Sequence, residues 1–248
     1  MHAQNDIPKA EIANDQILRG ATIAFDLDGT LVDTAPDLVG ALNTILAQEA
    51  LPPLPFDDVR LMVGRGARAL LERGFAAAGS PLDAEHAPPL VERFIAHYLT
   101  RIADESAPFP GVVEVLTDLK AAGARLVVCT NKLTNLSDAL LEAVGLLPFF
   151  DAVIGADSAP AAKPDGRHVA AAVAAVGGDV GRAVMIGDSI NDALGARNAG
   201  VPSVLVSFGY TEDPVETLGA DLVIHSFLDV PEACISLLTS CPAPNTGL

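Results

Sequence analysis

Ala21-Thr-Ile-Ala-Phe-Asp-Leu-Asp-Gly-Thr30 is a short apolar run that ends in two closely spaced carboxylates. The run ends abruptly at Asp26 and shows no alternation of apolar and polar side chains before that point. A half-exposed strand would alternate, whereas a strand of a parallel sheet is covered on both faces and is apolar throughout. The stretch therefore predicts a buried parallel strand that is followed directly by acidic side chains at its carboxyl end.

Similar apolar runs recur along the chain, and helical patterns separate them. The runs cover residues 125–130, 152–155, 183–187, 201–206 and 221–224. The helical patterns cover residues 111–122, 135–144, 168–176 and 192–199. Strands that alternate with helices are joined by right-handed crossovers and form a parallel sheet. The chain is therefore predicted to be an α/β protein with a doubly wound, Rossmann-like sheet.

Residues 34–108 break this rhythm. Their pattern predicts an all-helical insertion without a convincing strand, with helices over residues 35–49, 56–64, 65–78 and 87–101. Pro36 on one side and Pro108, Pro110 and Gly111 on the other predict stiff turns at which the insertion can hinge. The predicted division is an N-terminal extension (1–20), an α/β core (21–33 and 109–238), a helical cap (34–108) and a flexible tail (239–248).

The charge balance excludes some partners and requires others. The 248 residues carry a formal net charge of -17, which repels the phosphate backbone of a nucleic acid. The same field repels any phosphorylated substrate, so phosphate chemistry requires a cation or a local positive pocket. The three cysteines have no metal-binding spacing, and no long apolar segment indicates a signal peptide or membrane span. A cytoplasmic protein is expected, and both a monomer and a homodimer remain open.

Polar residues follow the predicted strands at their carboxyl ends, where open parallel sheets place their sites. The set comprises Asp26, Asp28, Thr130, Asn131, Asp188 and Asp192, and Lys163 precedes the strand predicted for residues 183–187. Two carboxylates two residues apart share one side of a strand end, which suits a nucleophile beside an acid or base. Several acids in one crevice repel one another, and oxygen ligands alone favour a hard ion such as Mg²⁺. Thr130 and Lys163 then supply a hydroxyl donor and a positive charge for phosphate oxygens.

Four segments resemble, in the same order, the signature motifs of the haloacid dehalogenase-like hydrolase superfamily. They are Asp26-Leu-Asp-Gly-Thr-Leu-Val-Asp-Thr34, Thr130-Asn131, Lys163-Pro164 and Gly187-Asp-Ser-Ile-Asn-Asp192. An isolated Asp-x-Asp is more often a turn or a helix cap, so the number and order of the segments make the resemblance specific. The resemblance covers residues 21–237. Within the superfamily, the chain most resembles the phosphoglycolate phosphatases, whose helical cap follows the first motif.

The resemblance implies a phosphatase with a phosphoaspartyl intermediate and Mg²⁺ as cofactor. Asp26 is expected to attack phosphorus, and Asp28 to protonate the leaving alcohol and then deprotonate the hydrolytic water. The Asp26 carboxylate, the Asp28 backbone carbonyl and Asp188 are the expected metal ligands. Thr130 and Lys163 are expected to bind the transferring phosphoryl group.

Other candidate residues carry less specific signals. Asn131 is a candidate substrate-binding residue because it adjoins Thr130 in the second motif. Asp192 is expected to ligate the metal through water, to orient Lys163, or to cap its helix. In the cap, the stretch from Leu61 to Ala67 resembles the substrate-facing loop of phosphoglycolate phosphatases. There Gly64 lets the backbone approach a small ligand, and Arg65 or Arg68 is a candidate partner for a substrate carboxylate.

Four other functions compete with this interpretation. Dehalogenases of the superfamily lack the second motif aspartate, which this chain has as Asp28. Phosphonoacetaldehyde hydrolases and mutases similar to β-phosphoglucomutase use a cap lysine, and residues 34–108 contain none. A non-catalytic binding protein of the same fold is disfavoured by the intact set of polar residues. The favoured substrate is 2-phosphoglycolate, and the alternative is a phosphatase or phosphotransferase that acts on sugar phosphates.

Overall fold

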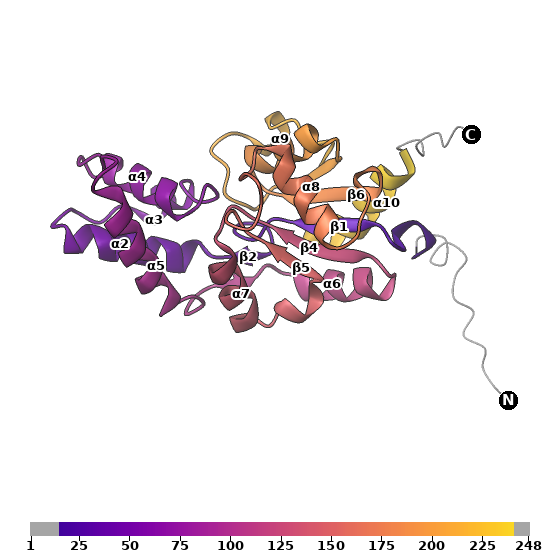
Figure 1. Ribbon diagram of the computed structural model, residues 1–248, viewed down its shortest axis with the longest axis horizontal. Helices are drawn as coiled ribbons and strands as arrows, with labels where there is room; N and C mark the ends of the chain where they lie inside the picture. The colour runs from indigo at the N-terminus through magenta and orange to yellow at the C-terminus, as the bar shows by residue number, and fades with distance from the viewer. Residues whose placement is uncertain (1–14, 241–248) are drawn as a thin grey trace.

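The computed structural model describes residues 15–240, and a six-stranded parallel sheet forms its core (Figure 1). The strands lie in the order β5-β4-β1-β6-β7-β8. Their bounds are β1 (Thr22–Phe25), β4 (Arg125–Cys129), β5 (Ala152–Ile154), β6 (Ala183–Gly187), β7 (Ser203–Val206) and β8 (Leu222–Ile224). The chain moves outward from β1 to β5 on one side and from β6 to β8 on the other. The predicted doubly wound sheet is confirmed, and its topological switch lies beside β1.

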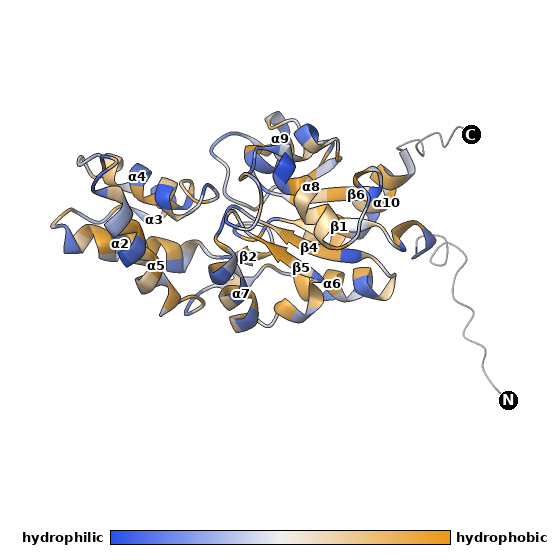
Figure 2. Ribbon diagram, viewed as in Figure 1, coloured by the Kyte–Doolittle hydropathy of each residue, from blue (hydrophilic) through white to orange (hydrophobic). Residues whose placement is uncertain are grey.

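Helices cover both faces of the sheet. One face carries α6 (Val112–Ala121), α7 (Thr134–Ala143) and α10 (Val230–Ser240), and the other carries α8 (Gly166–Ala175) and α9 (Ile190–Ala199). Along β1, the side chains of Ile23 and Phe25 pack with the first set of helices, and Ala24 packs with the second. Figure 2 shows the resulting hydrophobic strands between helices with polar outer faces. Burial on both faces explains why the sequence of β1 does not alternate.

The helical cap lies at one end of the molecule and the sheet at the other (Figure 1). Its helices are α2 (Ala35–Gln48), α3 (Phe56–Arg60), α4 (Ala67–Ala77) and α5 (Ala87–Leu99). Their apolar faces form a separate core around Leu42, Leu71, Phe94 and Tyr98. Leu136 of α7 and Tyr210 of the loop after β7 join this cluster, so the cap packs against the α/β core. The fold is therefore the predicted α/β sheet with an inserted helical cap.

The prediction that residues 34–108 contain no strand is wrong at one position. Val32–Asp33 (β2) pairs antiparallel with Ala107–Pro108 (β3), which holds the two connections to the cap side by side. Strands of two residues are too short to show a periodic pattern. The two central cap helices were also predicted too long. Gly64 and Gly66 have φ of 102° and 83°, so the chain cannot stay helical between α3 and α4.

The remaining predicted helix and strand ends differ from the structure by at most two residues. Short 3₁₀ helices occupy Leu147–Phe149, Val180–Arg182, Val215–Thr217 and Phe227–Asp229. The predicted extension lies outside the described residues up to residue 14, and the predicted tail lies outside them from residue 241, whereas residues 239 and 240 end α10. Within residues 15–240, no helix combines the length and apolarity needed to cross a bilayer.

Candidate active site

Asp26 and Asp28 lie at the carboxyl end of β1, in the middle of the sheet. The Asp26 amide donates to the Ile186 carbonyl at 2.8 Å, which continues the ladder between β1 and β6 and fixes the Asp26 backbone. Both residues are buried, with exposed fractions of 4% and 7%. Asp28 Oδ1 accepts a hydrogen bond from Thr34 Oγ1 at 2.7 Å. The strand end thus presents two adjacent, ordered carboxylates.

The Lys163 ammonium lies between two carboxylates. Its Nζ is 2.9 Å from Asp26 Oδ1 and 2.6 Å from Asp192 Oδ1, and it donates to the Cys129 carbonyl at 2.5 Å. Burial opposes the charge of Lys163, but Asp192 and Asp26 outweigh burial and hold its pKa above the usual range. The site therefore contains a buried positive charge beside Asp26 at neutral pH.

Two side chains hold the backbone of Lys163 in place. Asn131 Oδ1 accepts from the Lys163 amide at 2.9 Å, and Asn131 Nδ2 donates to the carbonyls of Lys163 at 3.1 Å and Gly64 at 3.2 Å. His168 Nδ1 lies 3.2 Å from the same Lys163 amide, and its Nε2 lies 3.2 Å from the Ile154 carbonyl. Because the amide can only donate, Nδ1 accepts and Nε2 carries the proton.

Asp188 follows β6 and is enclosed by backbone atoms. The Tyr210 amide donates to Asp188 Oδ2 at 2.6 Å, and Thr30 Oγ1 donates to Oδ1 at 3.4 Å. A Cβ atom at Gly29 would lie 2.4 Å from Asp188 Oδ2, and one at Gly209 would lie 2.2 Å from Asp188 Cβ. Both distances are shorter than any carbon can tolerate, so two glycines permit the close packing that fixes this carboxylate.

The acidic side chains form a group suited to a divalent ion. Oxygens of Asp26, Asp188 and Asp192 all lie within 4.8 Å of one another. Burial raises the pKa of Asp26 to about 6, with Lys163 opposing the rise and Asp192 adding to it. Burial, followed by repulsion from Asp192 and Asp26, raises the pKa of Asp188 well above its usual value. A buried excess of carboxylate oxygens without thiol or imidazole donors fits Mg²⁺.

Asp192 differs from the other two carboxylates because both of its oxygens are engaged. Oδ1 pairs with Lys163, and Oδ2 accepts from the Ser189 amide at 3.0 Å and from Ser189 Oγ at 2.7 Å. The second set of bonds forms a capping box at the start of α9. Among the alternatives for Asp192, these contacts favour orienting Lys163 and capping the helix over ligation through water.

The model of the haloacid dehalogenase-like hydrolase family matches residues 21–200. The chain belongs to this family. A protein of Caulobacter vibrioides named phosphoglycolate phosphatase is 89% identical over 231 residues, which cover 93% of this chain and 98% of the relative. A phosphoglycolate phosphatase of Agrobacterium fabrum is 47% identical and covers 87% of this chain and 93% of its own length. The crystal structure of a predicted phosphoglycolate phosphatase from Haemophilus somnus is 30% identical, with a TM-score of 0.80 over 87% of this chain and 98% of that one.

The other predicted site residues of this haloacid dehalogenase-like hydrolase lie in different places. Thr130 is buried at the carboxyl end of β4, beside β1, and its Oγ1 accepts from the Lys132 amide at 3.2 Å. The hydroxyl hydrogen of Thr130 remains available for another acceptor. Gly64 contacts the core through its carbonyl, which accepts from Asn131. The structure thus brings Thr130 to the sheet edge that carries Asp26, and joins Gly64 of the cap to that edge.

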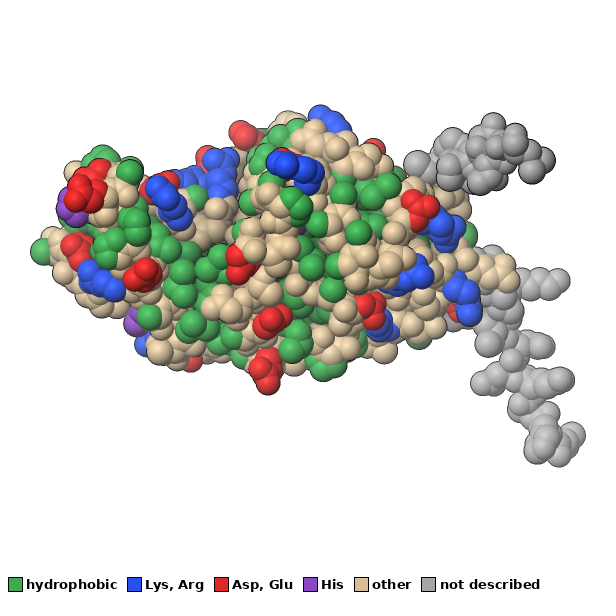
Figure 3. Space-filling view, in the orientation of Figure 1, with side chains coloured by type: hydrophobic (Ala, Val, Ile, Leu, Met, Phe, Trp, Pro, Cys, Tyr) green, Lys and Arg blue, Asp and Glu red, His purple; other side chains and the backbone are tan. Residues whose placement is uncertain are grey.

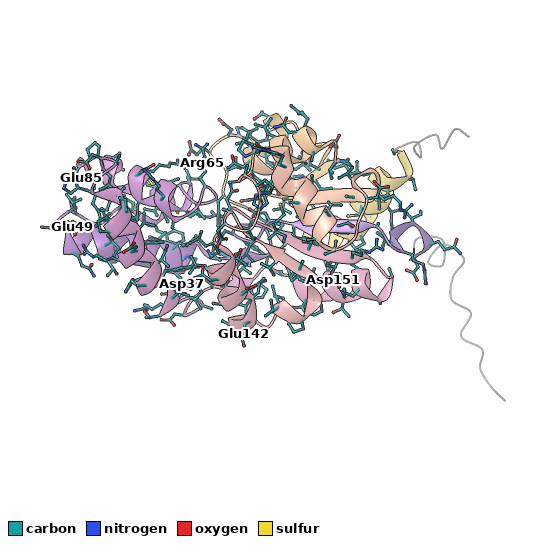
Figure 4. The ribbon with its side chains drawn as sticks, viewed as in Figure 1. Asp37, Glu49, Arg65, Glu85, Glu142 and Asp151 are labelled. Carbon is teal, nitrogen blue, oxygen red and sulfur yellow. The ribbon has the colours of Figure 1, made fainter. Side chains whose placement is uncertain are left out.

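The two cap arginines lie toward solvent. Arg65 is exposed on the loop between α3 and α4, and Figure 4 shows it at the edge of the cap that faces the core. It lines a cavity together with Arg73 and Glu212, separate from the cavity beside Asp28. Arg68 forms an exposed ion pair with Glu72 at 2.7 Å. Figure 3 shows basic side chains along this edge of the molecule.

Lys132 is a site residue that the sequence analysis did not identify. Its Nζ donates to Asp28 Oδ1 at 2.8 Å and to Oδ2 at 3.1 Å, and it lies 4.7 Å from the centroid of the Tyr98 ring. Burial opposes its charge, but Asp28 outweighs burial and holds the pKa of Lys132 above the usual range. The available signal was its position directly after Thr130 and Asn131 in the second motif.

A cavity lies between the cap and the core beside Asp28. Its empty volume is about 400 Å³, including open solvent at its mouth. Asp28 and Lys132 are its charged side chains, and Tyr98 also lines it. The rest of the lining is mostly apolar and comes from Leu38, Val63, Ala67, Leu70, Phe94, Leu133 and Leu136. The carboxylate expected to act as acid and base thus faces a largely apolar space.

The buried imidazole of His168 makes stability depend on pH. Burial, assisted by the charge of Lys163, lowers the pKa of His168 from 6.5 to about 4. Between these two values the unfolded chain binds a proton that the folded protein does not, so stability falls as the pH is lowered through this window. We expect His168→Gln to lose less stability than the wild type over the same window, by up to about 3 kcal/mol. Urea unfolding at several pH values measures the difference, and parallel curves would contradict it.

Proposed function

We propose that this chain is a cytoplasmic, Mg²⁺-dependent phosphatase that hydrolyses 2-phosphoglycolate through a phosphoaspartyl intermediate at Asp26. The observation that carries the proposal is the meeting of Asp26, Lys163 and Asp188 at the carboxyl end of β1, with Asp28 at the adjacent cavity. The names of the two relatives support the substrate. Reducing surroundings suit Cys129 and Cys234, whose buried thiols are free.

In the first half of the reaction, an oxygen of Asp26 attacks phosphorus and the bond from phosphorus to the ester oxygen breaks. Asp28 donates its proton to the departing alkoxide. In the second half, water attacks the phosphoaspartate, Asp28 accepts a proton from that water, and the bond between phosphorus and Asp26 breaks. A pKa of about 6 leaves most of Asp26 ionised at neutral pH, so the nucleophile is available.

The remaining residues bind the phosphoryl group and neutralise charge. Lys163 and Thr130 bind its oxygens, which places a positive charge and a hydroxyl donor where the net charge of -17 would otherwise repel the substrate. Asp26, Asp188 and the Asp28 backbone carbonyl are the ligands that would hold Mg²⁺. The bound ion supplies further positive charge for the transferring group. Residues 34–108 act as a cap that excludes water when closed.

Phosphate release from purified protein tests this function. We expect hydrolysis of 2-phosphoglycolate that stops in the presence of a chelator and returns when Mg²⁺ is added in excess. We also expect kcat/KM for 2-phosphoglycolate to exceed that for a hexose phosphate by at least about 10-fold, because the cavity beside Asp28 offers few polar partners for sugar hydroxyls. Preference for the hexose phosphate would contradict the substrate, and hydrolysis unaffected by the chelator would contradict the cofactor.

A further inference from the structure

Lys132 is a buried cation that the phosphoryl chemistry does not use. Lys163 is the ammonium that contacts the nucleophile, at 2.9 Å from Asp26 Oδ1. Lys132 instead contacts Asp28, and 5% of it is exposed. Burying an ammonium group costs free energy, because the charged group loses its hydration, so its partners in the buried site must compensate for this cost. Lys132 lines the cavity beside Asp28, where the leaving group of the substrate would lie, so the leaving group is the part of the substrate that Lys132 can contact.

Lys132 and Tyr98 both have hydrogen-bonding capacity left in this cavity. An ammonium has three N–H donors, and the side-chain acceptors of Lys132 among residues 15–240 are the two oxygens of Asp28. The Tyr98 hydroxyl is buried and, apart from the neighbouring Lys132 ammonium, has no polar partner in the same described range. Buried polar groups are normally paired, so an unpaired hydroxyl beside a partly used ammonium indicates a ligand that supplies an acceptor.

The distances fit a carboxylate close to the ester oxygen. Asp28 is the group that delivers a proton to that oxygen, and Lys132 Nζ is only 2.8 Å from Asp28 Oδ1. In 2-phosphoglycolate a single methylene group links the ester oxygen to the carboxylate, so the carboxylate lies within reach of the same ammonium. The cavity leaves only about 30 Å³ of free space for the centre of a water-sized group, which favours a small leaving group.

The apolar lining strengthens the attraction and disfavours neutral polar groups. Leu38, Leu70 and Phe94 surround the two polar side chains and lower the local dielectric constant. Sugar hydroxyls would lose hydrogen bonds to water here without replacing most of them. Arg65, one of the two arginines that the sequence offered as a candidate carboxylate partner, is exposed and lines a different cavity.

We propose that Lys132 and Tyr98 form a subsite that binds the carboxylate of the leaving group and thereby selects phosphomonoesters with a carboxylate next to the ester carbon. This subsite rests on the proposed phosphatase function and explains how the enzyme would distinguish its substrate from other phosphomonoesters. Lys132 donates its third N–H to the carboxylate, and the Tyr98 hydroxyl donates a second hydrogen bond.

The test compares 2-phosphoglycolate with 2-hydroxyethyl phosphate, which has a similar length and a neutral end. We expect the wild type to prefer the carboxylate by on the order of 10- to 100-fold in kcat/KM, as for a hydrogen-bonded charge. Lys132→Met should bring this ratio close to one, and Tyr98→Phe should lower it several-fold. Arg65→Met is the matched control and should keep the wild-type ratio. Because the readout is a ratio, any general effect of Lys132→Met on Asp28 cancels.

The outcomes separate the subsite from the function on which it rests. Failure of the wild type to hydrolyse either ester would overturn the phosphatase function. Hydrolysis without preference for the carboxylate, or an unchanged ratio in Lys132→Met, would overturn the subsite alone, as would loss of the ratio in Arg65→Met. If Lys132→Met does not fold, Tyr98→Phe decides the question, since it removes only an unpaired hydroxyl, and an unchanged ratio there overturns the subsite.

Discussion

Asp26→Asn is expected to abolish phosphate release and yet to make the metal-free protein more stable. An amide cannot form the phosphoaspartate, so kcat/KM should fall by on the order of 10⁴-fold or more. The gain in stability follows from the pKa of Asp26, which burial raises from 3.8 to about 6. Ionising this carboxyl group in the folded protein is therefore unfavourable, and the neutral amide should raise the free energy of unfolding at neutral pH by about 3 kcal/mol.

The size of this gain depends on pH. Between about 4 and 6 the folded state holds the Asp26 proton more tightly than the unfolded chain, so this group's contribution to wild-type stability declines as the pH rises through that window. The advantage of Asp26→Asn should therefore be largest above pH 6 and vanish below pH 4. Urea unfolding with a chelator measures it, and Asp118→Asn on the exposed face of α6 is the control. An Asn variant with the wild-type rate would refute the covalent scheme.

Lys163→Met is expected to be strongly destabilising as well as inactive. The substitution leaves Asp26 and Asp192 buried without the ammonium that lies 2.9 Å and 2.6 Å from them. Removing one member of a buried ion pair lowers the free energy of unfolding by about 3–5 kcal/mol, because the remaining charge is uncompensated. Added Mg²⁺ should recover part of the loss, since a cation near the same carboxylates relieves their repulsion. Chemical unfolding with and without Mg²⁺ measures both effects.

Lys120→Met provides a matched control for this substitution. Lys120 also forms an ion pair, 2.7 Å from Asp151, but both side chains are more than a third exposed. Exposed pairs contribute about 0–1 kcal/mol, so this variant should unfold near the wild-type denaturant concentration and keep its activity. Equal destabilisation by the two substitutions would show that burial of the Lys163 cluster is not the cause.

Much of the architecture follows from simple sequence patterns. The run that ends at Asp26 is apolar on both faces of β1, and that property could be identified without coordinates. The rule that sites lie at the carboxyl ends of parallel strands then brought Asp26 and Asp188 together, as the structure does. The need for a positive charge beside phosphate and the motif resemblance added Lys163, which the structure places beside Asp26. The roles of these residues in catalysis stay predictions, as do the cap boundaries at residues 34 and 108.

Other features depend on contacts that a linear pattern does not contain. Thr130, Asn131 and Lys132 are consecutive, yet Asn131 binds the Lys163 backbone and Lys132 reaches Asp28. Which of several polar neighbours faces the cavity depends on the path of the loop after β4, and no periodicity describes that path. The same limit explains Arg65, because it lies on a loop with two positive φ values at Gly64 and Gly66 and lines a cavity other than the one beside Asp28.

The packing around Asp188 has a consequence for how this sequence tolerates substitution. Gly29 and Gly209 have no reactive group, but even a methyl group at either position would overlap the Asp188 side chain. In a saturation library screened for turnover, alanine at these two sites should therefore be depleted as severely as loss of an acidic residue. Such a profile would identify positions that matter for activity because they lack a side chain.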